Sequence, residues 1–151
     1  MTLFLVLKFL HILFGVIAVG FNASYGFWLF QAHHDPKYLA FVLKKIKVMD
    51  RLLANPSYMG LGVTGPLMVW LGGYSWRALW IWMSVLLLVL AAILGIVVYS
   101  PLLNKQIKAL ESQGLRSKEY KALEARSNIL GVVLWGLVAV IIFLMVTKIQ
   151  L

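Results

Sequence analysis

Four segments of this chain are almost free of formal charge and are long enough to cross a lipid bilayer. A transmembrane helix needs about 20 predominantly apolar residues. Hydrophobic residues make up 62% of the 151 residues and charged residues 13%, which is too little polar surface to cover a soluble protein. We therefore predict an all-α integral membrane four-helix bundle that forms a single transmembrane domain over residues 1–151. The predicted spans are residues 2–30, 56–73, 77–100 and 128–148.

The two long connections between spans, residues 31–55 and 101–127, mix basic, acidic and apolar residues. In the first connection, apolar residues such as Leu39 and Leu43 recur at helical spacing, which predicts an amphipathic helix. In the second, a similar mixture on either side of Gly114 predicts two short helices that extend the third and fourth spans into water.

Short polar motifs predict where the helices begin and end. The pair Asn55-Pro56 is typical of a helix start, because asparagine caps free amide groups and proline has no amide to leave unpaired. Ser75 is predicted to cap the third span, and Pro101 is predicted to end or kink it.

The distribution of basic residues indicates the orientation in the membrane. Of the 14 Lys and Arg residues, five lie in residues 31–55 and six in residues 101–127. Cytoplasmic loops of membrane proteins are enriched in Lys and Arg. We therefore expect both connections in the cytoplasm and both termini on the outer side of a bacterial cytoplasmic (inner) membrane. This bias accounts for the net charge of +9, and no nucleic-acid partner is expected.

Several classes of chemistry are excluded by composition. The chain has no cysteine, so it has no disulfides, thiolate metal sites or cysteine nucleophiles. All five Asp and Glu residues lie in the two connections, and no P-loop, zinc motif or nucleophilic triad is present. Hydrolysis is therefore not expected, and any redox chemistry must come from a cofactor.

A polar stripe follows one face of the first span. Its members are separated by steps of three or four residues and are Lys8, His11, Gly15, Ala18, Asn22 and Tyr25. Lipid penalises lysine, histidine and asparagine, so this face should point into the bundle. Small residues on the other spans allow close helix packing or a homo-oligomer. The glycines among them are Gly62, Gly65, Gly95 and Gly131.

Two interpretations of His11 remain open. The imidazole can form an interhelical hydrogen bond without any ligand, because buried polar groups need partners. It can also bind a metal ion or heme iron, since neutral imidazole is a common axial ligand. Lys8, one turn away, either reaches the lipid phosphates or pairs with an anionic ligand. His33 and His34, at the exit of the span, are interpreted as solvated interfacial residues.

The depth of His11 in the membrane indicates which residues can face it. His11 lies about 12 Å along the first span. Counting inward from the outer ends of the other spans gives the segments at this depth: Thr64 to Met68 of the second span, Met83 to Leu86 of the third and Ala139 to Val140 of the fourth. Met68 and Met83 are therefore candidate second axial ligands, and Ser84 is a candidate hydrogen-bond partner.

Several motifs resemble known membrane families. The motif Leu7-Lys8-Phe9-Leu10-His11-Ile12, with the apolar helix that follows it, is similar to the start of the oxygen-independent protoporphyrinogen oxidase family of the J type. The likeness extends to Val63-Thr64-Gly65-Pro66 and to Trp80-Ile81-Trp82. The same motifs resemble two related four-span families, the uncharacterised predicted integral membrane proteins and the copper-resistance D-like proteins. In the oxidase family the first-span histidine is thought to bind heme b, and the resemblance implies this role for His11.

The resemblance to the oxidase is incomplete. The oxidase family has a lysine early in the third span, where this chain has Trp82-Met83-Ser84. Its arginine late in the first span is also missing here, between Gly26 and Trp28. The uncharacterised integral membrane family is therefore the closer match.

These observations lead to three functional hypotheses. The first is a membrane-embedded protein that binds heme b or takes part in redox chemistry, with His11 as the axial ligand of the iron. Its cofactor-binding residues would be His11, Lys8, Met68, Met83, Ser84, Asn22 and Arg77. In this hypothesis Lys8, Arg77 or Lys148 neutralises the propionates of the porphyrin. The second hypothesis is a component of a small-solute or copper transporter. The third is a structural or assembly protein without a cofactor, in contact with membrane lipid and with further copies of itself.

Overall fold

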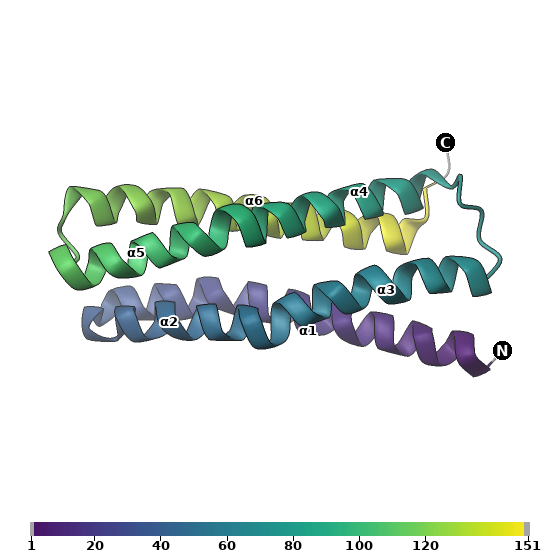
Figure 1. Cartoon of the computed structure of the whole chain (residues 1–151), viewed down its shortest axis with the longest axis horizontal. Helices are drawn as coiled ribbons and strands as arrows, with labels where there is room; N and C mark the ends of the chain where they lie inside the picture. The colour runs from purple at the N-terminus through teal and green to yellow at the C-terminus, as the bar shows by residue number, and fades with distance from the viewer. Residues whose placement is uncertain (1, 150–151) are drawn as a thin grey trace.

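The computed structural model describes residues 2–149 and contains only helices in this range, which confirms the predicted all-α class. The elements are α1 (Thr2–His34), η1 (Pro36–Tyr38), α2 (Leu39–Met49), η2 (Asp50–Ala54), α3 (Asn55–Leu71), α4 (Leu79–Ile93), η3 (Leu94–Tyr99), α5 (Ser100–Gln113) and α6 (Lys118–Thr147). They form two layers along a common long axis (Figure 1). One layer contains α1, α2 and α3, and the other contains α4, α5 and α6.

Three helical segments are long and apolar enough to cross a membrane: Thr2–His34, Leu79–Gln113 and Lys118–Thr147. The second predicted span, residues 56–73, corresponds to α3, which has 17 residues and lies at the short end of the range for a spanning helix. The N-terminus of α1 and the C-terminus of α6 lie at the same end of the molecule (Figure 1). The chain is therefore a helical membrane protein whose ends emerge on one side.

The helices do not stop at the two prolines where helix ends were predicted. The chain continues from α2 through η2 into α3, and from α4 through η3 into α5. No new helix therefore starts at Asn55, and of the two alternatives predicted for Pro101, a helix end and a kink, the helix end is wrong. The segments η2 and η3 are π-helical. The amide of Asn55 donates to the carbonyl of Asp50, and that of Ser100 to that of Gly95, five residues back in each case. This wider turn before each proline accommodates its missing amide and its ring without breaking the helix.

The start of α4 also differs from the sequence prediction. Ala78, rather than Ser75, precedes the first helical residue, and the hydroxyl of Ser75 accepts a hydrogen bond from the amide of Arg77 at 3.2 Å. The break at Gly114 is confirmed, since α5 ends there and Gly114 has a positive φ of 81° that glycine adopts without strain. Beyond it, the hydroxyl of Ser117 accepts from the amide of Tyr120 and caps α6.

The main hydrophobic core lies in the half of the molecule that holds the two charged connections. The core residues come from the end of α1, from α2, from α5 and from the start of α6. Those exposed by 2% or less are Leu39, Leu43, Ile46, Leu103 and Tyr120. Lys44 pairs with Glu111 across α2 and α5, and so joins the two layers at this end. The predicted amphipathic stripe of α2 is thus buried against the other layer.

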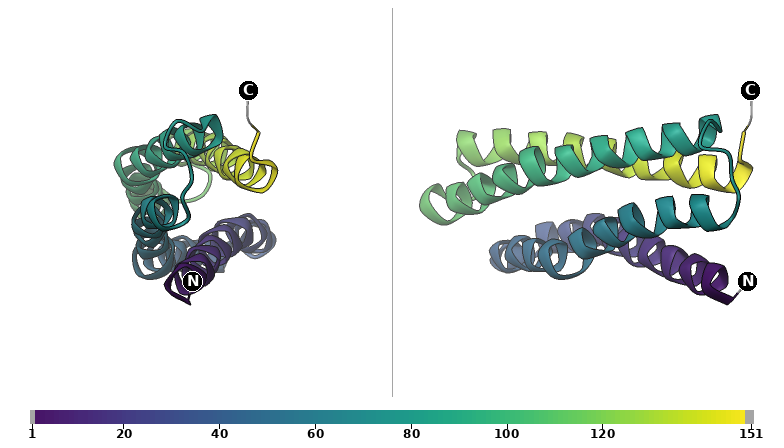
Figure 2. Two further views of the ribbon diagram at one scale, coloured as in Figure 1. Left: turned by 90° about the vertical axis from the view of Figure 1, so that its right-hand side faces the viewer. Right: turned by 45° about the vertical axis from the view of Figure 1, so that its right-hand side comes forward.

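The opposite half of the molecule is organised as two helix pairs that meet near the turn from α3 to α4. There Val69 of α3 packs with Trp80 and Ile81 of α4, and Met145 of α6 packs against them. Here α1 packs against α3, and α4 packs against α6 (Figure 2). Among the described residues, α1 makes no close backbone contact with α4, and α3 makes none with α6. Most of the large apolar side chains in this half are exposed. Such surfaces suit a lipid environment, which does not drive helices together as water does.

Candidate functional site

His11 forms an interhelical hydrogen bond in the α1–α3 pair. Its Nδ1 atom lies 2.7 Å from the hydroxyl oxygen of Thr64 on α3. The imidazole is half-buried, whereas Thr64 is buried. Thr64 belongs to the segment Thr64 to Met68, one of those that membrane depth predicted at the level of His11.

The hydrogen bonds around Thr64 determine which nitrogen of His11 carries the proton. The Thr64 hydroxyl donates its single proton to the carbonyl of Gly60, at 2.7 Å. Its oxygen therefore accepts from Nδ1–H of His11, and the Nε2 atom keeps its lone pair. An imidazole held at Nδ1 by a donor bond, with Nε2 free, has the form of a histidine that binds a metal.

Small residues on α3 make room for this face of α1. A Cβ atom on Gly65 would lie 3.4 Å from the Cε1 atom of His11, so the glycine keeps the space beside the imidazole open. A Cβ atom on Gly60 would lie 2.5 Å from the ring of Phe14, and so only glycine fits at this crossing. By contrast, a Cβ atom on Gly62 would meet nothing within 4 Å.

Two other predicted site residues lie on this helix pair near His11. Met68 lies one turn beyond Thr64 on α3, on the same face of that helix, and is half-buried. Lys8 lies one turn before His11 on α1, and its side chain is exposed. The structure therefore keeps Met68 and Lys8 within one turn of the His11–Thr64 pair.

The remaining predicted site residues lie elsewhere. Met83 and Ser84 belong to α4, which makes no close backbone contact with α1 in the described part of the chain. Arg77 lies in the exposed turn before α4. The ammonium group of Lys148 lies 5.1 Å from the ring centre of Tyr74, at the outer end of the other layer. The structure does not bring these residues together with His11 within one chain.

Asn22 has a structural partner of its own. Its side-chain amide donates to the carbonyl of Ala18 at 2.7 Å and to the hydroxyl of Tyr58 on α3 at 2.8 Å. Since Asn22 follows His11 by about three turns of α1, it forms a second polar link between α1 and α3 rather than part of the His11 site.

Near the charged end of the α1–α3 pair, the structure brings together a polar cluster that the sequence analysis missed. The carboxyl group of Asp50, in η2, lies within electrostatic range of the hydroxyls of Tyr25, Tyr58 and Tyr99, which come from α1, α3 and η3. Tyr25 is 6% exposed, and its hydroxyl lies outside hydrogen-bonding geometry. Asp50 belongs to none of the ion pairs of the described residues.

The environment of Asp50 favours its neutral form. Burial raises the pKa of Asp50 to about 6, and the interaction with Tyr25 lowers it only in part. The sequence held a signal for this position, because Asp50 follows Leu39, Leu43 and Ile46 at steps of three and four residues. It therefore lies on the buried stripe of its helix instead of the solvated face.

A second missed contact joins the two layers. His33 pairs through Nε2 with Glu124 of α6, and its Nδ1 lies 2.6 Å from the carbonyl of Leu29. The hydroxyl of Tyr120 donates to the same carboxylate oxygen at 3.1 Å. His33 remains partly exposed, as predicted, but it is held by a partner. Partial burial lowers its pKa, but the hydrogen bonds to Leu29 and Glu124 and the charge of Glu124 raise it above 6.5 overall.

Metal ligands are sparse in the described residues. No group of three or more His, Cys, Asp or Glu side chains is close enough to hold a metal ion in this part of the chain. A metal held at His11 would therefore need further ligands from methionine or from a macrocycle that brings its own nitrogens.

Comparison with known proteins gives one match. The model of a family described as predicted integral membrane protein (DUF2269) matches residues 5–149. No curated protein and no solved structure matches the chain.

Proposed function

The chain belongs to the DUF2269 family of predicted integral membrane proteins, and we propose that it binds heme b through the Nε2 atom of His11. The observation that supports this proposal is the Nδ1–H bond from His11 to Thr64, which leaves Nε2 as the free ligand atom. The resemblance of the His11 motif to the J-type oxidase family supports the same assignment. We place the protein in the bacterial cytoplasmic membrane, because its connections are rich in Lys and Arg.

The surroundings of His11 fit a flat ligand better than a bare metal ion. One imidazole is too few ligands for an ion on its own, whereas a porphyrin supplies four nitrogens and needs only an axial donor. Gly65 leaves space beside the imidazole, and Met68 lies on the same face of α3 as Thr64, one turn further along. Lys8 carries a positive charge one turn away, where it would pair with a propionate.

When bound, heme b supplies one-electron or small-molecule chemistry. The chain's own residues would orient the ligand: Thr64 holds the imidazole ring, and the carbonyl of Gly60 accepts the hydrogen bond that sets the direction of the Thr64 hydroxyl. Oxidation of protoporphyrinogen is not part of the proposal, because the third-span lysine of the oxidase family is absent at Trp82-Met83-Ser84.

An absorption spectrum of the detergent-purified protein, expressed with ample heme, tests the proposal. We expect a Soret band that disappears in His11→Ala and persists in His34→Ala, because His34 is exposed and bonds only to the carbonyl of Phe30. Thr64→Val should weaken heme binding by about 10- to 100-fold, and Thr64→Ser should restore it. Colourless wild-type protein, or a Soret band unchanged in His11→Ala, would refute heme binding and favour a purely structural role.

The Asp50 cluster favours a second candidate function, a component of a proton-coupled transporter for a small solute or a metal ion such as copper. A carboxyl group with a pKa of about 6 changes its charge near neutral pH. The Asn22–Tyr58 hydrogen bond continues the polar face from this cluster toward His11. Protein-dependent flux into liposomes that requires a proton gradient, and that Asp50→Asn abolishes, would support transport. Absence of flux in the wild-type protein would exclude it.

A further inference from the structure

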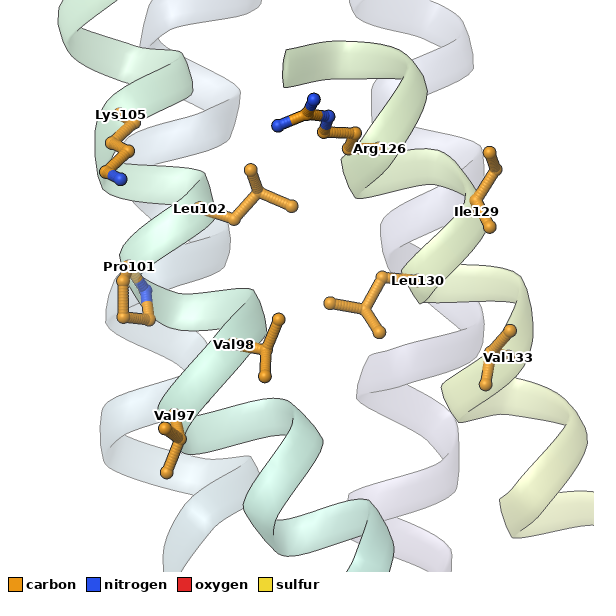
Figure 3. A pocket seen from close by; sticks show the side chains of 9 residues that line it. All are labelled: Val97, Val98, Pro101, Leu102, Lys105, Arg126, Ile129, Leu130 and Val133. Atoms are coloured by element: carbon orange, nitrogen blue, oxygen red, sulfur yellow. The ribbon is translucent and has the colours of Figure 1, made fainter. Parts of the chain in front are cut away.

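A groove of about 500 Å³ lies between the two helices of the α4–α6 layer, near the charged end of the molecule (Figure 3). Its walls come from η3 and α5 on one side and from α6 on the other. In Figure 3 the cationic residues Lys105 and Arg126 lie at one end of the groove, and Val97 and Val133 lie toward the other. The groove is therefore basic at one end and apolar along the rest of its length.

The spacing of the lining residues explains this polarity. On α6, Arg126, Leu130 and Val133 are separated by steps of four and three residues and share one helix face. On the other side, Lys105 follows Pro101 by one turn. Each wall thus places one basic residue at the cytoplasmic end and apolar residues beyond it.

Neither basic residue is neutralised within the described part of the chain. The ion pairs there join Glu124 to His33, Asp35 to Lys37 and Glu111 to Lys44, and they include neither Lys105 nor Arg126. Both side chains are exposed. Two positive charges at one end of an apolar groove are complementary to a ligand with an anionic head and a hydrocarbon tail.

The position of the groove along the chain matches the membrane boundary. Lys105 and Arg126 lie in the connection assigned to the cytoplasm, whereas Val97 and Val133 lie in the predicted third and fourth spans. The apolar walls are open to their surroundings, since Val97 is 66% exposed and Ile129 is 67% exposed. A lipid of the inner leaflet has its headgroup at the level of Lys105 and Arg126 and its acyl chains at the level of Val97 and Val133.

We propose that this groove binds one anionic phospholipid of the cytoplasmic leaflet. The guanidinium of Arg126 and the ammonium of Lys105 bind the headgroup phosphate, and an acyl chain lies along Val98, Leu130 and Val133. Arg126 supplies the directional contact because its planar group donates two parallel hydrogen bonds to a phosphate, while Lys105 acts as a point charge. The proposal does not depend on heme binding by His11.

Lipid exchange into the full-length protein in detergent, measured by native mass spectrometry, tests the site. The probe lipids are phosphatidylglycerol and phosphatidylcholine with identical chains. We expect the wild-type protein to retain phosphatidylglycerol in preference to phosphatidylcholine. The double variant Lys105→Gln/Arg126→Gln should bind phosphatidylglycerol about 10- to 30-fold more weakly.

A matched variant separates this site from general attraction to basic surfaces. Lys118→Gln/Lys121→Gln removes the same charge from exposed residues of α6 outside the groove, and it should leave retention of phosphatidylglycerol unchanged. An equal loss in both double variants, or no preference in the wild-type protein, would overturn the proposal. Displacement of the lipid by glycerophosphoglycerol, which lacks acyl chains, would also overturn it, because the apolar walls would then have no role.

Discussion

The charged half and the apolar half of this molecule are built from the same helices but are held together differently. In the charged half, α1, α2, α5 and α6 enclose one hydrophobic core, and ion pairs join the two layers. In the apolar half, the α1–α3 pair and the α4–α6 pair run side by side and share a small hydrophobic cluster at their end, where Val69 packs with Trp80, Ile81 and Met145. The charged half follows the rules of a water-soluble bundle, because burial of apolar side chains away from water drives its packing. The apolar half has no such drive, because lipid is as apolar as the side chains themselves.

This contrast changes how the polar contacts of the apolar half are understood. His11–Thr64 and Asn22–Tyr58 both lie within the α1–α3 pair, and no described hydrogen bond joins this pair to α4 or α6 in this half. Polar contacts and the close approach at Gly60 therefore stabilise the pair. The core of the charged half and the small cluster of Val69, Trp80 and Ile81 place the two pairs relative to each other.

The largest expected difference between the halves is in the cost of removing a leucine. Leu43→Ala should lower the free energy of unfolding by about 2–5 kcal/mol, because Leu43 is 1% exposed and its removal leaves a cavity in the core. Leu86→Ala on α4, where the leucine is 63% exposed, should change it by less than about 0.5 kcal/mol. Unfolding in mixed micelles, followed by circular dichroism, measures both values. Equal costs would show that Leu86 is packed as closely as Leu43.

The next effect concerns the Asp50 cluster, where the two halves meet. A folded-state pKa of about 6 against an ordinary value of 3.8 means that the folded protein holds a proton that the unfolded chain has released. Stability should therefore fall as the pH rises from about 4 to about 6, by up to about 3 kcal/mol, and stay constant above that. Asp50→Asn should remove this dependence and raise the unfolding midpoint at pH 7.5. The exposed, ion-paired Asp35 provides the control, since Asp35→Asn should leave the pH profile unchanged.

A smaller effect is expected from the helix crossing in the apolar half. Gly60→Ala should destabilise the protein by about 1–3 kcal/mol, because the added Cβ would lie 2.5 Å from the Phe14 ring. The whole ring, and not only its far end, would have to move to make room. Gly62→Ala, on the same helix, meets nothing within 4 Å and should be neutral or slightly stabilising. Thermal unfolding of the two variants in the same detergent compares them directly. A neutral Gly60→Ala would mean that α1 and α3 are not closely packed.

The smallest predicted effect is at the contact between His33 and Glu124. The raised pKa of His33 means that this contact contributes stability below pH 6.5, which is lost as the pH rises through the folded-state pKa. The pair is partly exposed, so His33→Gln should cost less than about 1 kcal/mol at pH 6 and nothing at high pH. Thermal unfolding across this pH range measures the effect, and His34→Gln is the matched control. The same loss of stability at high pH would show that the His33 ring stabilises the protein by packing and not through its ion pair with Glu124.

The sequence alone was sufficient for the all-α membrane class, for the break at Gly114 and for the common membrane level of His11 and Thr64. Each of these depends on local properties, because apolar length predicts a span, a glycine tolerates positive φ, and equal depth brings residues on neighbouring helices to the same level. The sequence also held a signal for Asp50, which follows the buried stripe of α2 at helical spacing. Asp50 was nevertheless missed, because all five carboxylates lie in the two connections and were expected to be solvated there.

Only the tertiary structure decided which helices form pairs. A polar stripe predicts that α1 has a partner face, but α3 and α4 carry similar small and apolar residues, and lipid imposes no preference between them. The pairing of α1 with α3 separates His11 from Met83 and Ser84. The packing of the two layers joins His33 to Glu124 and places Tyr99 of η3 near Asp50. These features depend on contacts between distant segments, so the order of residues within one helix does not determine them.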